Sequence, residues 1–360
     1  MTVRARLGAL PKGTPRVPPA ASASAFYQFV EVNGVLFPQE EILNLIAGNG
    51  ISLLGADDPG NNRTNVTITS LFCDNVVAVL ADLPAPVAGV ISLTSGSWCF
   101  VNDIDLGANS LVVPAGVTVF LTSEGKRLTS THATATLDVQ TATSLCTAEG
   151  LHFRNTGAGF GVRSVNGGTF YNRFELCMFE ATIAFEQLAG GVIIDTSQVI
   201  GSTDGIRMND NAGRVVVTSS VFTNAATRHI NAEIGFSLQV IGCYFSNAAT
   251  AIEFDGDPDH AVVSGCEFDS LTTGIRVLAG MQDCRVVGNS FSLCATIGIT
   301  MAVAAVPAGG FSMVGNSFDL NGADYGPFTH LTARVNSKAN VSSASPSILT
   351  PLLPETPIVP

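Results

Sequence analysis

The sequence has 360 residues, of which 46% are hydrophobic and only 13% are charged, and its formal net charge is −12. That charged share is about half of the usual one for a soluble protein, and the acidic balance excludes broad nucleic-acid binding. No apolar run reaches membrane-spanning length, and the first twenty residues lack the apolar core of a secretory signal. We therefore expect no nucleic-acid partner and no membrane insertion.

Residues 1–25 are rich in Pro, Ala and Ser, and the only charges before residue 31 are Arg4, Arg6, Lys12 and Arg16. This composition predicts an extended basic arm with no core of its own. Two interpretations stay open at this point. The arm is either a floppy terminus or a segment that orders only when it docks onto a partner.

Residues 26–70 have the pattern of a small separate unit. Asn33-Gly34 is a hairpin turn signal inside FVEVNGVLF, and the segment from Pro38 to Gly48 predicts a short helix. GISLLG and RTNVTITS alternate as strands do, with Asp57-Asp58 in the turn between them. About forty residues with so few apolar groups are marginal alone, so we expect this unit to dock onto another protein.

The pattern of residue types along the sequence changes near residue 71. A short helix is predicted over residues 73–82, and short strands separated by Gly, Asn, Ser and Pro follow it. Residues 326–360 form a tail with prolines at 346, 351, 354, 357 and 360, which excludes a central strand or a helix. The tail is either an extended strap or disordered.

A repeat of about 23 residues dominates the part between these ends. VIGCYFSNAATAIEF and VVSGCEFDSLTTGIRV place Cys243 and Cys266, and then Phe245 and Phe268, at the same interval. The aligned apolar positions are Phe153, Phe179, Val199, Phe222, Phe245, Phe268, Phe291 and Phe318. A second series follows at Ile206, Ile230, Ile252, Ile275 and Ile299. Self-similarity at such a period indicates stacked repeats.

Each repeat holds short strands with period-two alternation and no helical pattern. Such a unit buries its apolar side only when the chain coils so that each turn pairs in parallel with the last. The sequence therefore predicts a parallel β-helix. The position two before each Phe would form an inner ladder, where Asn bonds to Asn one coil away. Cys243 and Cys266 in that ladder are predicted to be buried thiols, not metal ligands or redox groups.

Eight cysteines without a CxxC pair do not constitute a disulfide framework, which fits synthesis in a reducing cytosol. No sequence feature calls for a cofactor or gives a clear metal site. We expect no cofactor.

The repeats resemble those of the right-handed parallel β-helix, or pectin-lyase-like, superfamily, over roughly residues 85–325. The resemblance implies an all-β chain, a right-handed parallel β-helix over residues 71–325 with its clear coils at 145–320, and a small N-terminal docking unit. AGNGISLLGADDPGNNRTNVTIT is similar to segments of bacteriophage tail and appendage proteins. This fold carries hydrolases, lyases, adhesins and viral spikes alike, so the resemblance is specific for fold rather than activity.

Pectin-degrading members carry paired Asp residues, a Gly-His-Gly and an Arg-x-Lys, and the repeats here contain none of these. The densest acidic cluster is EFDGDPDH, from Glu253 to His260. Three residues past successive repeat Ile positions lie Asn209, Glu233 and Asp255, which would stack in an exposed turn. Carboxylates one coil apart would be about 5 Å from each other, near the separation in retaining glycosidases.

Glu233 and Asp255 are therefore the candidate catalytic pair. A structural Ca²⁺ held by stacked carboxylates is a second interpretation, and an ordinary polar turn is a third. Candidate carbohydrate-binding residues are Tyr244, Asp257 and Asn209. Tyr244 should point away from Phe245, and Tyr171 and Tyr325 are further aromatic candidates for a sugar platform.

These features favour a virion structural protein of a phage, a tail spike or fibre, assembled in the host bacterial cytoplasm. We expect a homotrimer that attaches to other virion proteins, such as tail, adaptor or capsid proteins, through residues 1–70. Its β-helix would then bind a host-surface glycan as receptor. Two alternatives stay open, namely a depolymerase (a glycoside hydrolase or polysaccharide lyase) and a capsid decoration protein with no receptor role.

Overall fold

The computed structural model describes residues 29–32, 35–38, 51–58, 63–70, 73–141, 143–165, 171–233, 235–256, 260–278, 283–301, 310–328, 335–338 and 340–342. Contacts divide the chain into two units, residues 1–76 and 77–360. Among the described residues there is no helix long and apolar enough to cross a membrane.

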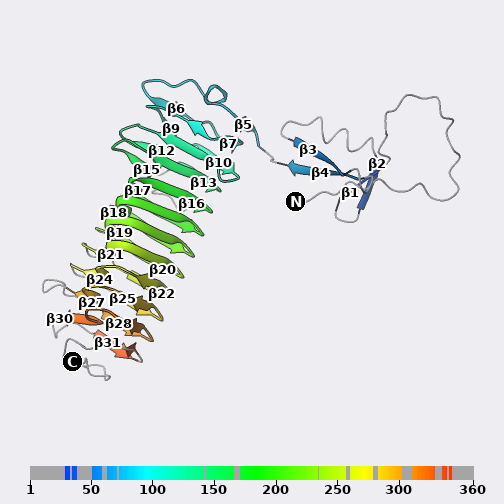
Figure 1. The fold of residues 1–360 in the computed structure, drawn as a ribbon. Helices are drawn as coiled ribbons and strands as arrows, with labels where there is room; N and C mark the ends of the chain where they lie inside the picture. The colour runs from blue at the N-terminus through cyan, green and yellow to red at the C-terminus, as the bar shows by residue number, and fades with distance from the viewer. Residues whose placement is uncertain are drawn as a thin grey trace, which may run out of the picture. The chain divides into compact units, whose positions relative to one another are not determined.

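The first unit contains two antiparallel hairpins (Figure 1). Strand β1 (Phe29–Val32) pairs with β2 (Val35–Pro38), and β3 (Ile51–Asp58) pairs with β4 (Arg63–Ser70). The pairing of Val32 with Val35 confirms the hairpin expected around Asn33-Gly34. Asp57 and Asp58 lie inside β3, opposite Thr64 and Arg63, so their expected place in a turn is wrong. The helix expected from Pro38 to Gly48 falls outside the described residues beyond Pro38.

The second unit is a β-helix whose strands stack in parallel along one axis (Figure 1). Each turn of the chain crosses three faces in succession. Strands of the first face are β5 (Asn75–Val77), β7 (Gly96–Phe100), β10 (Thr118–Ser123), β13 (Leu145–Glu149), β16 (Asn172–Glu175), β20 (Gly235–Ile241), β22 (His260–Ser264), β25 (Asp283–Val287), β28 (Gly310–Val314) and β31 (Val335–Lys338).

The second face has β8 (Ile104–Asp105), β11 (Arg127–Ser130), β14 (His152–Asn155), β23 (Glu267–Asp269), β26 (Ser290–Ser292), β29 (Ser317–Asp319) and β32 (Val341–Ser342). The third has β6 (Val90–Ser92), β9 (Ser110–Val113), β12 (Ala135–Val139), β15 (Phe160–Val165), β24 (Thr273–Val277), β27 (Ile297–Met301) and β30 (Tyr325–Phe328).

Four long strands bend around the corners and belong to more than one face. Strands β17 (Met178–Asp195) and β18 (Gln198–Thr218) run through all three, whereas β19 (Val221–Ala232) and β21 (Tyr244–Phe254) cover the second and third. Because one turn takes about as many residues as the sequence repeat, each residue returns above its counterpart. This confirms the all-β class and the coiled architecture.

The aligned Phe positions form one continuous stack inside the second face. All eight positions pair in the expected order from Phe153 to Phe318. The rings of Phe268 and Phe291 are parallel, with centroids 4.5 Å apart. The Ile series stacks in the same way inside the third face. These side chains are fully buried, and their removal from water supplies the main driving force of folding.

The corner between the first and second faces confirms the predicted ladder. Asn289 donates from Nδ2 to Asn316 Oδ1 at 3.0 Å, and Asn316 donates in turn to Asn340 Oδ1 at 3.0 Å. The residue before each of Cys243, Cys266, Asn289 and Asn316 is a glycine with φ between +63° and +66°. Glycine adopts this left-handed conformation without the steric cost that a side chain brings.

Cysteine placement follows the same geometry. Cys243 and Cys266 are buried free thiols, as expected, and so are Cys146, Cys177, Cys284 and Cys294. Cys73 and Cys99 are disulfide-bonded, which the sequence analysis did not foresee.

Two other expectations need correction. Residues 73–82 do not form a helix of the expected length, because β5 occupies Asn75–Val77 and a 3₁₀ turn, η1, covers only Leu80–Asp82. The β-helix also continues past residue 325, where the sequence analysis ends it, because β31 and β32 pair with β28 and β29. The proline-rich residues 343–360 lie outside the described residues.

Candidate functional site

The outer side of the third face carries a row of charges that alternate in sign and are interrupted once, by Asn231. The position after the first four repeat Ile residues, Ile206 to Ile275, and its equivalent in earlier turns points outward because side chains alternate along a strand. Strand register places these positions one above another in seven successive turns. We call them the charged row, which consists of Asp138, Arg163, Glu186, Arg207, Asn231, Glu253 and Arg276.

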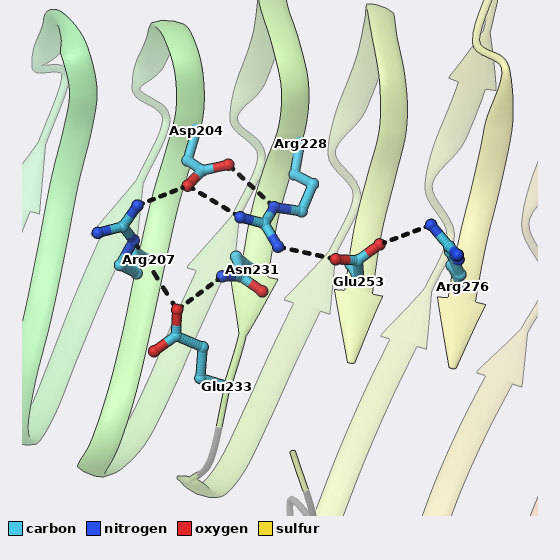
Figure 2. Close-up of polar contacts among 7 residues, drawn as sticks. All are labelled: Asp204, Arg207, Arg228, Asn231, Glu233, Glu253 and Arg276. Atoms are coloured by element: carbon cyan, nitrogen blue, oxygen red, sulfur yellow. Dashed lines mark hydrogen bonds and ion pairs between the residues drawn. The ribbon is translucent and has the colours of Figure 1, made fainter. Parts of the chain in front are cut away.

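The charged row is joined to a second pair of charges, Asp204 and Arg228, which lie two residues before the Ile positions (Figure 2). Arg228 donates from Nε to Asp204 Oδ1 at 3.0 Å and from Nη1 to Glu253 Oε1 at 2.8 Å. Arg207 donates to Asp204 Oδ2 at 3.0 Å, and Arg276 donates to Glu253 Oε2 at 3.4 Å. Each of these two carboxylates therefore lies between two guanidinium groups.

Burial governs the electrostatics of this network. Asp204 is fully buried and Glu253 nearly so. Burial opposes the charge on Arg228, but its hydrogen bonds to Asp204 and Glu253 outweigh that effect and raise its pKa. Burial raises the pKa of the Asp138 and Glu186 carboxyl groups, and the nearby guanidinium of Arg163 opposes this shift. The network is thus a set of mutually neutralised charges linking successive turns.

The three residues that the sequence predicts to stack in an exposed turn lie at the edge of this network. Asn209, Glu233 and Asp255 directly follow Met208, Ala232 and Phe254, which are paired in register. Glu233 Oε1 accepts a hydrogen bond from Asn231 Nδ2 at 3.0 Å and lies 4.0 Å from Arg207 Nε. Its side chain is 38% exposed. Asn209 donates to Glu186 Oε1 at 3.4 Å, and Asp255 is exposed.

The structure therefore puts Glu233 and Asp255 in adjacent turns, but the contacts of Glu233 are to Asn231 and Arg207. Within the described part of the chain there is no group of three or more His, Cys, Asp or Glu side chains arranged to hold a metal ion.

The aromatic candidates separate by burial. Tyr244 points outward, opposite to the buried Phe245, and its hydroxyl donates to Asp269 Oδ2 at 3.3 Å. Tyr171 is 38% exposed, whereas Tyr325 is only 8% exposed and packs beside Phe318 in the inner stack. Tyr325 is therefore not available as a sugar platform. Asp257 lies outside the described residues.

Sequence reasoning missed most of the network, notably Asp204, Arg228 and Arg276. One signal was available, because alignment on the repeat Ile puts Arg207, Asn231, Glu253 and Arg276 in a single column. The ion pair between Asp204 and Arg228 was harder to predict from the sequence, since the register shifts between Ile200 and Asp204.

An open groove of about 560 Å³ runs along the corner between the second and third faces. Four successive turns contribute to it, so its long direction follows the β-helix axis. We call it the alanine-lined groove, and its lining residues are Ala225, Ala226, Asn247, Ala248, Ala249, Ser270, Leu271, Thr272, Leu293 and Ala295. None of these side chains is charged, which suits a neutral ligand.

Comparison with known proteins agrees with this architecture. Residues 182–341 match the family described as the right handed beta helix region. This part of the chain is a right-handed β-helix.

Two solved structures show partial similarity to this chain. The alginate lyase from Paenibacillus sp. str. FPU-7 has 15% sequence identity and a TM-score of 0.34, covering 74% of this chain and 98% of that one. The mannuronan C-5 epimerase AlgE6 A-module of Azotobacter vinelandii has 13% identity and a TM-score of 0.24, covering 71% and 91%. No curated protein matches the sequence significantly.

Proposed function

We propose that this chain is a bacteriophage tail spike or fibre subunit whose right-handed β-helix recognises a polysaccharide on the host surface. The alanine-lined groove carries this proposal. It crosses four successive turns, and its lining offers amide and hydroxyl groups between small apolar ones. A linear polymer laid along the axis would contact one turn after another, about 4.8 Å apart.

The N-terminal part supports placement on a virion. Residues 1–25 form a basic, proline-rich segment, and residues 26–70 hold a unit with few apolar groups. In this proposal they dock onto tail, adaptor or capsid proteins, and the β-helix faces the host.

Recognition is favoured over cleavage of the glycan chain by the contacts of the carboxylates. Asp204 and Glu253 are each held by two guanidinium groups, and Glu233 is bound to Asn231. A glycosidase needs one carboxylate free to act as nucleophile or base and one as acid. A depolymerase built on Glu233 and Asp255 is the second candidate, because adjacent turns bring these two positions together. A capsid decoration protein is the third.

The groove is tested with arginine substitutions at its exposed alanines. The variant Ala226→Arg/Ala249→Arg fills the groove with two long side chains without entering the core. The matched control is Ala108→Arg, at an exposed alanine outside the groove. We expect wild-type protein and the control to bind one member of a panel of purified bacterial surface polysaccharides and the groove variant to lose at least tenfold in affinity. Equal binding by all three proteins would exclude this groove as the recognition surface.

The assembly is tested separately by light scattering on the full chain. A homotrimer should have three times the mass of the 37.3 kDa chain. A monomer at all concentrations would remove the support for a spike or fibre. Immunogold labelling of phage particles then separates a tail location from the capsid surface expected of a decoration protein.

A further inference from the structure

A second cluster of ionisable side chains lies on the outer side of the second face, away from the charged row. Strand register puts Arg127 beside His152 and Arg154 beside Glu180. Glu180 uses both carboxylate oxygens within this cluster. Oε2 lies 3.0 Å from His152 Nε2, and Oε1 lies 3.2 Å from Arg154 Nε.

These contacts determine which nitrogen of the His152 ring carries the proton. A carboxylate only accepts hydrogen bonds, so Nε2 must be the donor. In the neutral ring the lone pair is then on Nδ1, and no described residue makes a hydrogen bond to that atom. Glu180 thus orients the ring in the way that a carboxylate orients a general-base histidine.

The ring is also kept neutral near pH 7. Burial lowers the pKa of His152, and the positive charges of Arg127 and Arg154 lower it further. Glu180 raises this pKa but does not offset the decrease. The side chain is still 16% exposed, so a ligand or a water molecule can reach it. A neutral, oriented and accessible imidazole is the form that accepts a proton.

A groove of about 520 Å³ lies beside this ring, along the corner between the first and second faces. We call it the His152 groove, and its lining is Gly125, Gly150, Leu151, His152, Leu176, Cys177, Met178, Thr196, Ser197, Gln198, Ser219 and Val221. The lining contains no Asp, Glu, Lys or Arg, and His152 is its one basic side chain. Leu176, Met178 and Val221 give the groove an apolar part.

Leu176 places an exposed apolar side chain on a strained backbone in this lining, as Leu293 and Leu320 do at another corner. Its φ is +54°, in the left-handed region, and 54% of the residue is exposed. The same corner position holds Thr196 and Ser219, also with positive φ, in the next two turns, and glycine in later turns, at Gly242 and Gly265. A leucine there strains the backbone and gains little burial within this chain. Contact with a bound apolar group would offset that strain.

We propose that His152 is the general base of a site that hydrolyses carboxylic esters, such as O-acetyl groups, carried by a neutral glycan. His152 Nδ1 takes a proton from a water molecule while the water oxygen bonds to the ester carbonyl carbon. The carbonyl oxygen becomes an oxyanion, which the terminal nitrogens of Arg154 stabilise. Collapse of this tetrahedral intermediate breaks the bond between the acyl carbon and the sugar oxygen. That oxygen takes the proton back from the imidazolium, releasing a carboxylic acid and a free sugar hydroxyl.

The groove favours a neutral esterified glycan over an acidic one. A polymer of acidic sugars would carry a carboxylate at each unit, yet no Lys or Arg side chain lines the groove. The apolar part formed by Leu176, Met178 and Val221 instead suits the methyl end of an acyl group. The terminal nitrogens of Arg154 make no hydrogen bond to another described residue, which leaves them free for an oxyanion.

The first test measures hydrolysis of p-nitrophenyl acetate by the full-length protein. His152→Gln keeps a donor for Glu180 but removes the basic nitrogen, and we expect it to lower kcat/KM at least 100-fold. Glu180→Gln should lower it by a smaller factor, because the ring loses its anchor. His260→Gln is the matched control at an exposed histidine and should leave the rate unchanged. Unchanged hydrolysis in His152→Gln would overturn the proposal.

The pH profile separates this site from hydrolysis by any exposed imidazole. The base form of His152 is active and its pKa is lowered, so the rate should rise with pH with a midpoint below the ordinary histidine value of 6.5. A midpoint at the ordinary histidine value would contradict the proposal.

Met178→Arg should raise KM more than it lowers kcat, because the arginine occupies the groove and leaves His152 and Glu180 in place.

A second substrate tests whether the ester is carried by a glycan. Acetate release from a neutral O-acetylated polysaccharide, here acetylated glucomannan, should depend on His152 in the same way. Equal binding of surface polysaccharide by wild type and by Ala226→Arg/Ala249→Arg would affect the proposed function alone. Loss of p-nitrophenyl acetate hydrolysis in His152→Gln would still support the ester site. Hydrolysis of neither ester would overturn it.

Discussion

Arg228 and Asp204 form an ion pair between neighbouring turns, with Nε 3.0 Å from Oδ1 and the Asp204 side chain entirely out of solvent. The same guanidinium reaches Glu253 in the next turn at 2.8 Å. One side chain thus ties three turns together on the outer side of the third face. Because burial makes an unpaired charge costly, this arrangement has a strong consequence for stability.

We expect Arg228→Met to lower the free energy of unfolding by about 3 kcal/mol or more, since it leaves Asp204 with Arg207 alone. Urea denaturation measures the change. Arg285→Met is the matched control, because Arg285 is 62% exposed and pairs only with Asp283. Exposed pairs contribute about 0–1 kcal/mol. Similar losses in the two variants would contradict a stabilising role for the buried pair.

His229 should make stability fall in mild acid. Its ring is fully buried between Phe222 and Phe245, and burial lowers its pKa to about 4, despite a hydrogen bond with the Ser246 carbonyl. The unfolded chain binds this proton near pH 6.5 and the folded chain only near pH 4. The stabilisation is therefore complete above pH 6.5 and declines by about 3 kcal/mol as pH falls to 4.

Replacing His229 with Phe should remove this part of the pH dependence while keeping a ring between Phe222 and Phe245. The free energy of unfolding of wild type and variant, measured from pH 4 to pH 7, gives the difference directly. His260→Phe, at an exposed histidine, should leave the slope unchanged. A parallel pH profile for wild type and His229→Phe would show that this ring is not the cause.

Asn316 is the centre of the inner ladder. Its Oδ1 accepts hydrogen bonds from the backbone N–H and the side chain of Asn289, and its Nδ2 donates to the Val286 carbonyl. Asn316→Ala leaves these buried groups without partners, and we expect a loss of about 2–4 kcal/mol in thermal or urea unfolding.

Serine should serve better than alanine at the same position. In earlier turns Ser197 and Ser220 accept the backbone N–H of the preceding turn, and Ser220 donates to the Thr218 carbonyl. Asn316→Ser should therefore retain part of the stability that Asn316→Ala loses. Equal losses would mean that volume, rather than hydrogen bonding, decides this position.

The free thiols should be unreactive in the native protein. All six are buried, and burial raises the pKa of Cys177 and of Cys294 to about 12. A hydrogen bond with Cys243 lowers the pKa of Cys266, but that residue is only 2% exposed and reagents do not reach it. Because the thiolate is the reactive form, Ellman's reagent at pH 8 should modify none of them rapidly, and six per chain after denaturation without reductant. Ser270→Cys, at an exposed corner, is the positive control. Rapid reaction of native wild type would contradict the described burial.

The sequence by itself determined the coiled β-fold, the Phe and Ile stacks and the inner ladder. The physical reason is that each turn of a parallel β-helix returns a residue to the place of its counterpart, so a constant interval in sequence becomes contact in space. The column of charges after the repeat Ile was readable in the same way. The N-terminal hairpin followed from its Asn33-Gly34 turn chemistry alone.

Only the tertiary structure decided which polar groups meet. Asp204 reaches Arg228 across a register shift, and Glu180 reaches His152 diagonally, because register pairs His152 with Met178. Corner residues differ in number between turns, so the sequence interval no longer tells which side chains face each other. Burial is likewise a property of the assembled turns. Burial lowers the pKa of His229, and hydrogen bonds to Asp204 and Glu253 raise the pKa of Arg228, only when the neighbouring coils are in place.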